Sequence, residues 1–252
     1  MKWEKYIFGL VDLLGQSRKL DELGSLWWEI QGSGMVVEKE KSERIRELTD
    51  DTYEEVEYFR ERFTHVFDTL KQFVLENARN KSLSPDEQAV VTRMAEDMCK
   101  LRSFSDMIVF YAPLDSAGEL LARFGLAAML CACVGVLTVE FKAGTFFRGG
   151  IEVGAGRELG NGDIYGPVLN EAYRLEKEVA VYPRIVIGKK LSEFIERTGQ
   201  PSDAGEFLNS VLVRVNEICK NLICRDDDGK VILDYLGEKS SRSESVPLQG
   251  SL

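Results

Sequence analysis

The sequence predicts an α+β fold formed as a single domain. Apolar runs of strand length and amphipathic runs of helix length alternate irregularly, and one pair of strands is joined directly, which favours α+β over a doubly wound sheet. No internal repeat or linker divides the 252 residues. A chain of this length buries a full apolar core without disulfides or metal ions as staples.

The N-terminal half predicts one strand followed by a helical region. The first strand is "YIFGLVDLL", residues 6–14, an apolar run that carries Asp12 near its end. Aromatic and aliphatic residues recur at spacings of three and four over 45–79, which predicts a long amphipathic helix packed on a core or a partner. In "SLSPDEQ", Ser84 precedes a proline and acids, as in a helix N-cap, and a second helix is expected to reach about Lys100.

The C-terminal half begins with another strand-rich run that an acid interrupts. Residues 103–113, "SFSDMIVFYAP", contain Asp106 and end in a proline. An apolar helix is expected over 116–140. The remaining elements, in order, are a strand at "GTFFRGGIEVGAG", a turn at "ELGNGD", a helix within 162–177, a strand at 179–188 expected at an edge or bulge because of its proline, helices near 190–198 and 204–222, and a turn with a last strand at "DDDGKVILDYL".

Composition excludes several classes of function. A net charge of -10 argues against a surface that grips nucleic acid through its phosphates. Five cysteines, without a CxxC pair, indicate reduced thiols in a cytoplasmic protein, and the N-terminus lacks the features of a signal peptide. With His65 as the single histidine, histidine triads and His-based zinc sites are nearly excluded. The apolar run 126–139 is shorter than the roughly 20 residues that cross a bilayer, so we expect a core helix and no direct membrane contact.

Two carboxylates stand out because each enters an apolar strand. Asp12 and Asp106 are separated in sequence by two predicted helices, and they would meet if their strands were neighbours in one sheet. Two converging carboxylates can hold one or two Mg²⁺ or Mn²⁺ ions, because hard cations prefer oxygen ligands. In an acidic protein, such ions are the ordinary means of holding a triphosphate.

The stretch "GDIYGPVLNEAYRLEK" carries a second candidate site. Asn170 and Arg174 are four residues apart and therefore share one face of the predicted helix, with Asp163 seven residues before the asparagine. Two donors on one face suit an anion. Taken alone, these residues more often form a solvated helix face, and Asp12 or Asp106 alone is about as often a structural acid as a ligand.

Three motifs, in order, resemble those of class III nucleotidyl cyclases. "GLVDLLG" is similar to the family's first metal strand, "RSFSDMIVF" to its second metal hairpin, and "DIYGPVLNEAYR" to its Asp, six residues, Asn-x-Ala-x-Arg motif. Four further segments are most similar in sequence to the pyrimidine cyclases of Pycsar anti-phage defence: "FSD", "FRGGIEVG", "VYPRIVIG" and "DDDGKVILDYL". The resemblance implies the ferredoxin-like cyclase fold over 1–238, with a helical insertion at about 40–100 after the first strand. The polar stretch 239–252 is expected to be a flexible tail.

The resemblance also implies a role for each motif residue. Asp12 and Asp106 would coordinate two Mn²⁺ or Mg²⁺ ions, and the carbonyl of Leu13 would add a ligand. Asn170 would orient the ribose, and Arg174 would stabilise the pentavalent α-phosphate while the 3′-hydroxyl attacks and pyrophosphate leaves. Because the family builds each site from two antiparallel domains, a single-domain chain is expected to form a homodimer with two composite sites.

Base choice in the family depends on two positions, which are Arg102 and Asp163 here. An arginine whose guanidinium donates hydrogen bonds to uracil O4 would select UTP, whereas an aspartate that accepts a hydrogen bond from an exocyclic amine would suit CTP. The residues leave both open, and the overall resemblance favours UTP, conversion to 3′,5′-cyclic UMP, and a second messenger sensed by a separate effector protein.

The sequence also departs from the family pattern. Gln16 replaces a common aromatic and Ser105 a common glycine, and the usual lysine-rich turn for the terminal phosphates is absent, which leaves Lys230 as a weak candidate. Two other readings remain: a catalytically silent cyclase-like module that senses nucleotide or dimerises, and an accessory protein that binds a partner through its long helix.

Overall fold

In the computed structural model, the strands form one mixed sheet. The structure describes residues 3–32, 39–79, 83–96, 99–104, 106–114, 118–160, 162–197, 206–235 and 237, so the tail predicted at 239–252 lies outside the described residues. The sheet order is β2-β3-β1-β4-β6-β8-β7, with β5 paired to β4. The β4–β6 pair is parallel and the other pairs are antiparallel. The strands are β1 (Glu4–Leu13), β2 (Lys100–Phe104), β3 (Met107–Pro113), β4 (Phe147–Glu158), β5 (Ile164–Tyr165), β6 (Ile185–Ile187), β7 (Ile223–Arg225) and β8 (Val231–Leu233).

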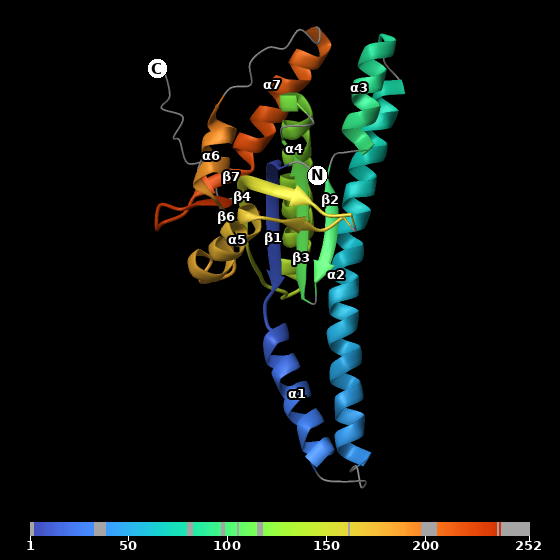
Figure 1. Cartoon of the computed structure of the whole chain (residues 1–252), viewed down its shortest axis with the longest axis vertical. Helices are drawn as coiled ribbons and strands as arrows, with labels where there is room; N and C mark the ends of the chain where they lie inside the picture. Colours follow the sequence, from blue (N-terminus) through green and yellow to red (C-terminus); the bar gives the residue numbers. More distant parts are fainter. Residues whose placement is uncertain are drawn as a thin grey trace, which may run out of the picture.

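Helices cover both faces of this sheet. They are α1 (Gln16–Gly32), α2 (Lys39–Arg79), α3 (Pro85–Glu96), α4 (Gly118–Lys142), α5 (Pro167–Arg174), the π-helical turn η1 (Leu175–Val179), α6 (Lys189–Glu196) and α7 (Glu206–Asn221). Figure 1 shows α4 behind the sheet and α5 in front of it. The α+β class predicted from the sequence is confirmed by this mixed arrangement.

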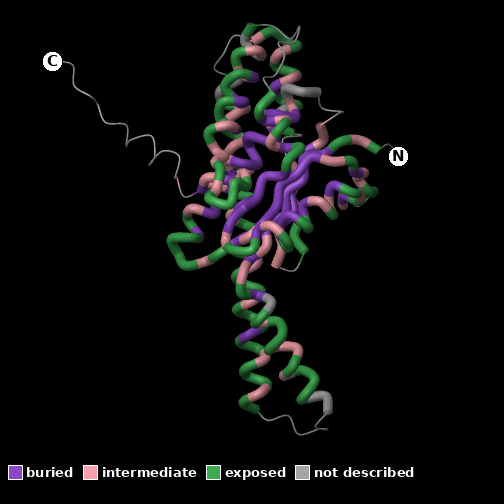
Figure 2. The backbone as a smooth tube through the Cα atoms, turned by 90° about the vertical axis from the view of Figure 1, so that its left-hand side faces the viewer, coloured by how far each residue is buried: buried purple, intermediate pink, exposed green. Residues whose placement is uncertain are grey.

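The alternation of side chains along β1 separates two apolar clusters. Ile7, Val11 and Leu13 point into the large core, which α2, α4, α6 and α7 cover. Tyr6, Phe8 and Leu10 point the other way, toward α5. Figure 2 shows the strands as the buried centre of the molecule. Asp12 follows Leu10 by two positions, so its side chain points to the same side of the sheet, the side that α5 covers.

The helical region after β1 begins earlier than the sequence pattern indicated. Helix α1 starts at Gln16, and α2 runs from Lys39 rather than from about 45. Together α1 and α2 form a hairpin that extends beyond the end of the sheet, where most of its residues are exposed (Figures 1 and 2). The predicted long helix is confirmed, and part of its aromatic stripe is core packing, because Phe59 stacks on Phe147 at 4.6 Å.

The predicted helix start at Ser84 is also confirmed. Its hydroxyl accepts a hydrogen bond from the backbone N–H of Glu87 at 3.3 Å, while the Glu87 carboxylate accepts from the backbone N–H of Ser84 at 2.9 Å. This reciprocal pair is a capping box, which satisfies backbone donors that the helix itself leaves free.

Three strand predictions need correction. The run predicted at 103–113 divides between β2 and β3, which pair as a hairpin with Asp106 in the turn. The expected strand at 179–188 shortens to β6, because η1 ends at Val179 and Pro183 lies before the first strand residue. Strand β6 is interior, between β4 and β8, rather than at an edge. Strand β7 was not predicted, and it pairs with β8 as a hairpin at the sheet edge.

The apolar helix predicted at 116–140 is α4. Over Leu121–Lys142 it is long and apolar enough to cross a bilayer by length and composition, and 61% of that window is buried inside the protein. Leu126, Met129 and Leu130 have no exposed surface and pack in the large core. The interpretation as a core helix is consistent with this burial.

Candidate functional site

Asp12 and Asp106 come together at one end of the sheet. Asp12 is the penultimate residue of β1, and Asp106 lies in the turn that joins β2 to β3. The backbone N–H of Leu13 donates to the carbonyl of Asp106 at 3.1 Å, which ties the two segments together. The neighbouring strands on which the prediction depended are therefore confirmed, because β1 pairs directly with β3.

The electrostatics of Asp12 reflect a crowded acidic site. Its side chain is 14% exposed. Burial, followed by repulsion from Asp106 and Glu176, raises the pKa of Asp12 to about 6, and Arg148 acts in the opposite direction. Repulsion from Asp106 also contributes to a raised pKa for Glu176, for which burial is the main cause. Asp12, Asp106 and Glu176 are thus within electrostatic reach of one another.

Arg148 and Glu176 belong to this site, and the sequence analysis did not single them out. Arg148 lies on β4 directly opposite Asp12 on β1, and its Nε is 3.2 Å from Asp12 Oδ2. The same nitrogen forms an ion pair with Glu176, which is 2% exposed and lies in η1. The segment Leu175–Val179 reads LEKEV, with two acids and a lysine, so its sequence carries no signal that Glu176 in particular is buried.

The donor set fits a divalent cation that takes its other ligands from a substrate. The Asp12 carboxylate already accepts a cationic group, the guanidinium of Arg148, and burial together with repulsion from Asp106 and Glu176 still raises its pKa. Among the described residues, no group of three or more His, Cys, Asp or Glu side chains has the arrangement of a metal cage. Two carboxylates with open positions suit Mg²⁺ or Mn²⁺, which commonly complete their shells with water and phosphate oxygens.

Asn170 and Arg174 lie on the outer face of α5. Val168 and Ala172 on the same helix are fully buried against the sheet, so Asn170 and Arg174, which each follow one of them by two positions, turn outward. Both Asn170 and Arg174 are exposed, and Arg174 forms an ion pair with Glu171 at 3.1 Å. In the described part of the chain, no hydrogen bond or ion pair connects this pair with Asp12 or Asp106.

Arg102 and Asp163 lie close together on the α5 face. The guanidinium of Arg102 packs against Gly162, where a Cβ atom would collide with Nη2, and Asp163 is the next residue. The hydroxyl of Tyr111 donates to the carbonyl of Gly162. Arg102 and Asp163 act on the pKa of Tyr111 in opposite directions, while burial is the main cause of its rise. Tyr111 therefore fixes the turn that carries Asp163.

Lys230 lies in a different part of the molecule. It follows the "DDDG" turn between β7 and β8, at the opposite edge of the sheet from β2. The acids of this turn have a structural role. Asp226 and Asp228 each lie 2.8 Å from a guanidinium nitrogen of Arg184, whose side chain is 3% exposed.

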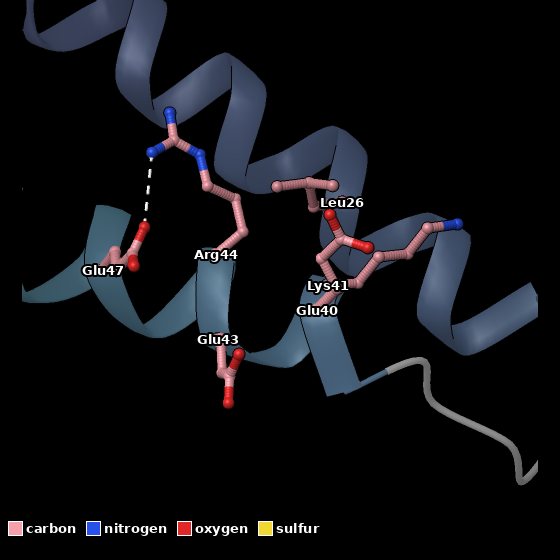
Figure 3. A pocket seen from close by; sticks show the side chains of 6 residues that line it. All are labelled: Leu26, Glu40, Lys41, Glu43, Arg44 and Glu47. Carbon is pink, nitrogen blue, oxygen red and sulfur yellow. Dashed lines mark ion pairs between the residues drawn. The ribbon is translucent and has the colours of Figure 1, made fainter.

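A groove between α1 and α2 contains none of the candidate residues. Figure 3 shows its charged lining, in which Arg44 pairs with Glu47 at 3.6 Å. The lining residues are Leu26, Glu40, Lys41, Glu43, Arg44 and Glu47. The groove is separate from the acidic site at the end of β1.

Comparisons with known proteins found likeness in structure alone. No family model and no curated protein matches the sequence. The guanylate cyclase domain of RhGC from Catenaria anguillulae, solved with GTP, has a TM-score of 0.41 and 13% identity over 81% of this chain and 90% of that chain. A rhodopsin-guanylyl cyclase core with converted specificity, solved with ATPalphaS, has a TM-score of 0.40 and 12% identity over 92% and 97%. A bacterial light-regulated adenylyl cyclase has a TM-score of 0.37 and 9% identity over 85% and 100%. At such scores, the case for a function rests on this chain's own residues.

Proposed function

We propose that the protein is a metal-dependent nucleotidyl cyclase. The observation that carries the proposal is the meeting of Asp12 and Asp106 at the end of β1, beside a helix that exposes Asn170 and Arg174 one turn apart. Two convergent carboxylates and a pair of donors are the groups that phosphoryl transfer requires, because its catalysis is mostly positioning and stabilisation of charge.

Each residue has a defined task in this proposal. Asp12, Asp106 and the Leu13 carbonyl would hold two Mn²⁺ or Mg²⁺ ions, which neutralise triphosphate charge and make the 3′-hydroxyl more acidic. Asn170 orients the ribose by hydrogen bonding, and Arg174 donates to the α-phosphate oxygens as charge builds on them. The 3′ oxygen forms a bond to the α-phosphorus, the bond to the bridging oxygen breaks, and pyrophosphate leaves with the electron pair while the hydroxyl proton passes to solvent.

The site is proposed to require two chains. Asn170 and Arg174 turn away from the sheet on which Asp12 lies, which supports a site completed by a second copy of the protein. In a two-fold symmetric homodimer, the acids of each chain would meet the donors of its partner, which gives two equivalent composite sites. A separated monomer would then be inactive.

The substrate is proposed to be UTP, with cyclic UMP as the product. Arg102 and Asp163 lie together and offer a donor fork beside an acceptor, which matches O4 and N3–H of uracil. The same pair can face cytosine, so CTP and cyclic CMP are the alternative. The resemblance in sequence motifs is the basis for the choice of UTP. It is also the basis for proposing a messenger role in anti-phage defence, an effector protein that senses the product, and action in the cytoplasm without direct membrane contact.

Incubation with single nucleotides tests the proposal. The purified chain is mixed separately with ATP, GTP, CTP and UTP in Mn²⁺, and the products are identified by mass spectrometry. Cyclic UMP from UTP supports the full proposal, and cyclic CMP alone replaces the substrate assignment. Absence of any cyclic product in all four mixtures would refute the proposed cyclase activity and favour a silent nucleotide-sensing or dimerisation module.

A further inference from the structure

Arg148 connects the proposed metal site with the helix that carries Asn170 and Arg174. Its Nε lies 3.2 Å from Oδ2 of Asp12 and also pairs with the carboxylate of Glu176. The two acids thus share one guanidinium nitrogen, and they come from different elements, β1 and η1. The side chain of Arg148 is 34% exposed, whereas that of Glu176 is 3% exposed.

Glu176 lies in a segment that packs closely on the sheet. Its backbone follows α5 without a break, and this segment packs directly on β4 at Gly150, where a Cβ atom would be 3.1 Å from the Glu176 nitrogen and 2.5 Å from the carbonyl oxygen of Ala172. Asp12 lies one residue from the end of β1, where it is paired with both β3 and β4. The close packing of this segment on β4 places the Glu176 carboxylate beside the guanidinium of Arg148.

The charges around Arg148 do not balance. Asp12, Asp106 and Glu176 influence one another electrostatically, Arg148 contacts two of these three acids, and Lys177 also lowers the pKa of Glu176. Buried carboxylates without a partner are costly, so a cation at this place stabilises the metal-free protein. A metal ion that approaches Asp12 meets the same guanidinium as a like charge.

We propose that Arg148 is a positioning residue that takes the place of a cation beside Asp12 until metal binds, and that Glu176 sets how strongly Arg148 competes with the metal. This inference rests on the metal site of the proposed function. Glu176 draws the guanidinium toward η1 and away from Asp12, which leaves the Asp12 carboxylate accessible to the ion. The ion pair between Arg148 and Glu176 then remains when the contact with Asp12 is given up.

Mn²⁺ binding to the full chain without nucleotide tests this arrangement, with isothermal titration calorimetry or the loss of the free Mn²⁺ electron paramagnetic resonance signal as the readout. Arg148→Gln is expected to lower the Kd for Mn²⁺ by roughly tenfold, because a like charge beside the ion is removed. Glu176→Gln, which is nearly isosteric, is expected to raise the Kd by a similar factor, because the guanidinium is released toward Asp12. Lys142→Gln removes an exposed charge at the end of α4 and is expected to leave the Kd unchanged.

The double variant separates competition by Arg148 from a general field effect. If Glu176 acts through Arg148, adding Glu176→Gln to Arg148→Gln changes the Kd by less than about twofold, whereas independent charges give additive changes. Additive changes, or single variants that shift the Kd in the same direction, would overturn the inference. If Arg148→Gln does not fold, Glu176→Gln must still weaken binding.

Failure of the proposed function gives a different result. Absence of Mn²⁺ binding by the unaltered chain would overturn the proposed metal site and this inference together. Binding that neither single variant alters would overturn the inference alone and leave the cyclase proposal intact.

Discussion

Gly150 marks the closest approach between β4 and the helix of the proposed site, and its replacement by alanine has a calculable effect. The new Cβ would lie 2.5 Å from the carbonyl oxygen of Ala172 and 2.5 Å from Cβ of Leu175, whereas ordinary contact begins at 3.4 Å. The backbone of α5 must therefore retreat by about 0.9 Å, the difference between these distances. Overpacking of this kind lowers the free energy of unfolding by about 1–3 kcal/mol.

The same shift moves Asn170 and Arg174. A displacement of about 1 Å in a positioning element costs on the order of 100-fold in rate, so Gly150→Ala is expected to slow cyclisation by about that factor. Urea unfolding measures the first effect, and cyclic product formed per minute measures the second.

Gly135→Ala is the matched control for this change. Gly135 lies in α4 with no heavy atom within 4 Å of its added Cβ, so alanine is expected to raise the free energy of unfolding by about 0.5–1 kcal/mol through helix propensity alone. A Gly150→Ala protein as stable and as active as the unaltered chain would refute the packing argument and the position assigned to α5.

Three further predictions concern the site itself. Asp106→Ala is expected to abolish cyclisation while circular dichroism and dimer mass stay unchanged; retained turnover would remove Asp106 from the site. Arg174→Ala is expected to lower kcat far more than it raises KM, because its contact strengthens as charge develops, and a change confined to KM would contradict that role. In metal-free protein, Asp12→Asn is expected to stabilise the fold at pH 7 but not at pH 4. Burial raises the pKa of Asp12 from 3.8 to about 6, so folding disfavours the ionised form and the penalty disappears as pH falls through 6 toward 4. The expected increase in the free energy of unfolding is at most about 3 kcal/mol, at 1.36 kcal/mol per pKa unit, and urea unfolding at a series of pH values measures it. An increase that does not vary with pH would contradict this reasoning.

Asp12 and Asp106 were predictable as candidates because each stands beside a strongly apolar run of the sequence, although Asp106 lies in the turn between β2 and β3 rather than within a strand. A carboxylate in such a run is costly unless it has a partner or a function, so Asp12 and Asp106 were conspicuous in the sequence. The helix face with Asn170 and Arg174 followed from spacing alone. These residues could be singled out without knowing which strands pair, whereas the expectation that Asp12 and Asp106 meet depended on the pairing of β1 with β3.

Arg148 was not predictable in the same way. The register of β1 against β4 places it opposite Asp12, and that register depends on packing across the whole sheet. The interior position of β6 was predicted wrongly for a related reason, because its pairing with β4 connects segments about 36 positions apart, Gly149 and Ile185. Residue patterns identify which side chains need partners, and non-local pairing decides which partners they have.

A mixture of two inactive variants tests the central claim most directly. Asp12→Ala removes an acid from one half of the proposed composite site, and Arg174→Ala removes the donor from the other half. If the chains exchange freely, half of the dimers are mixed and each of these has one intact site, so about a quarter of the unaltered activity is expected. A mixture no more active than the separate variants would contradict a cyclase site shared between two chains.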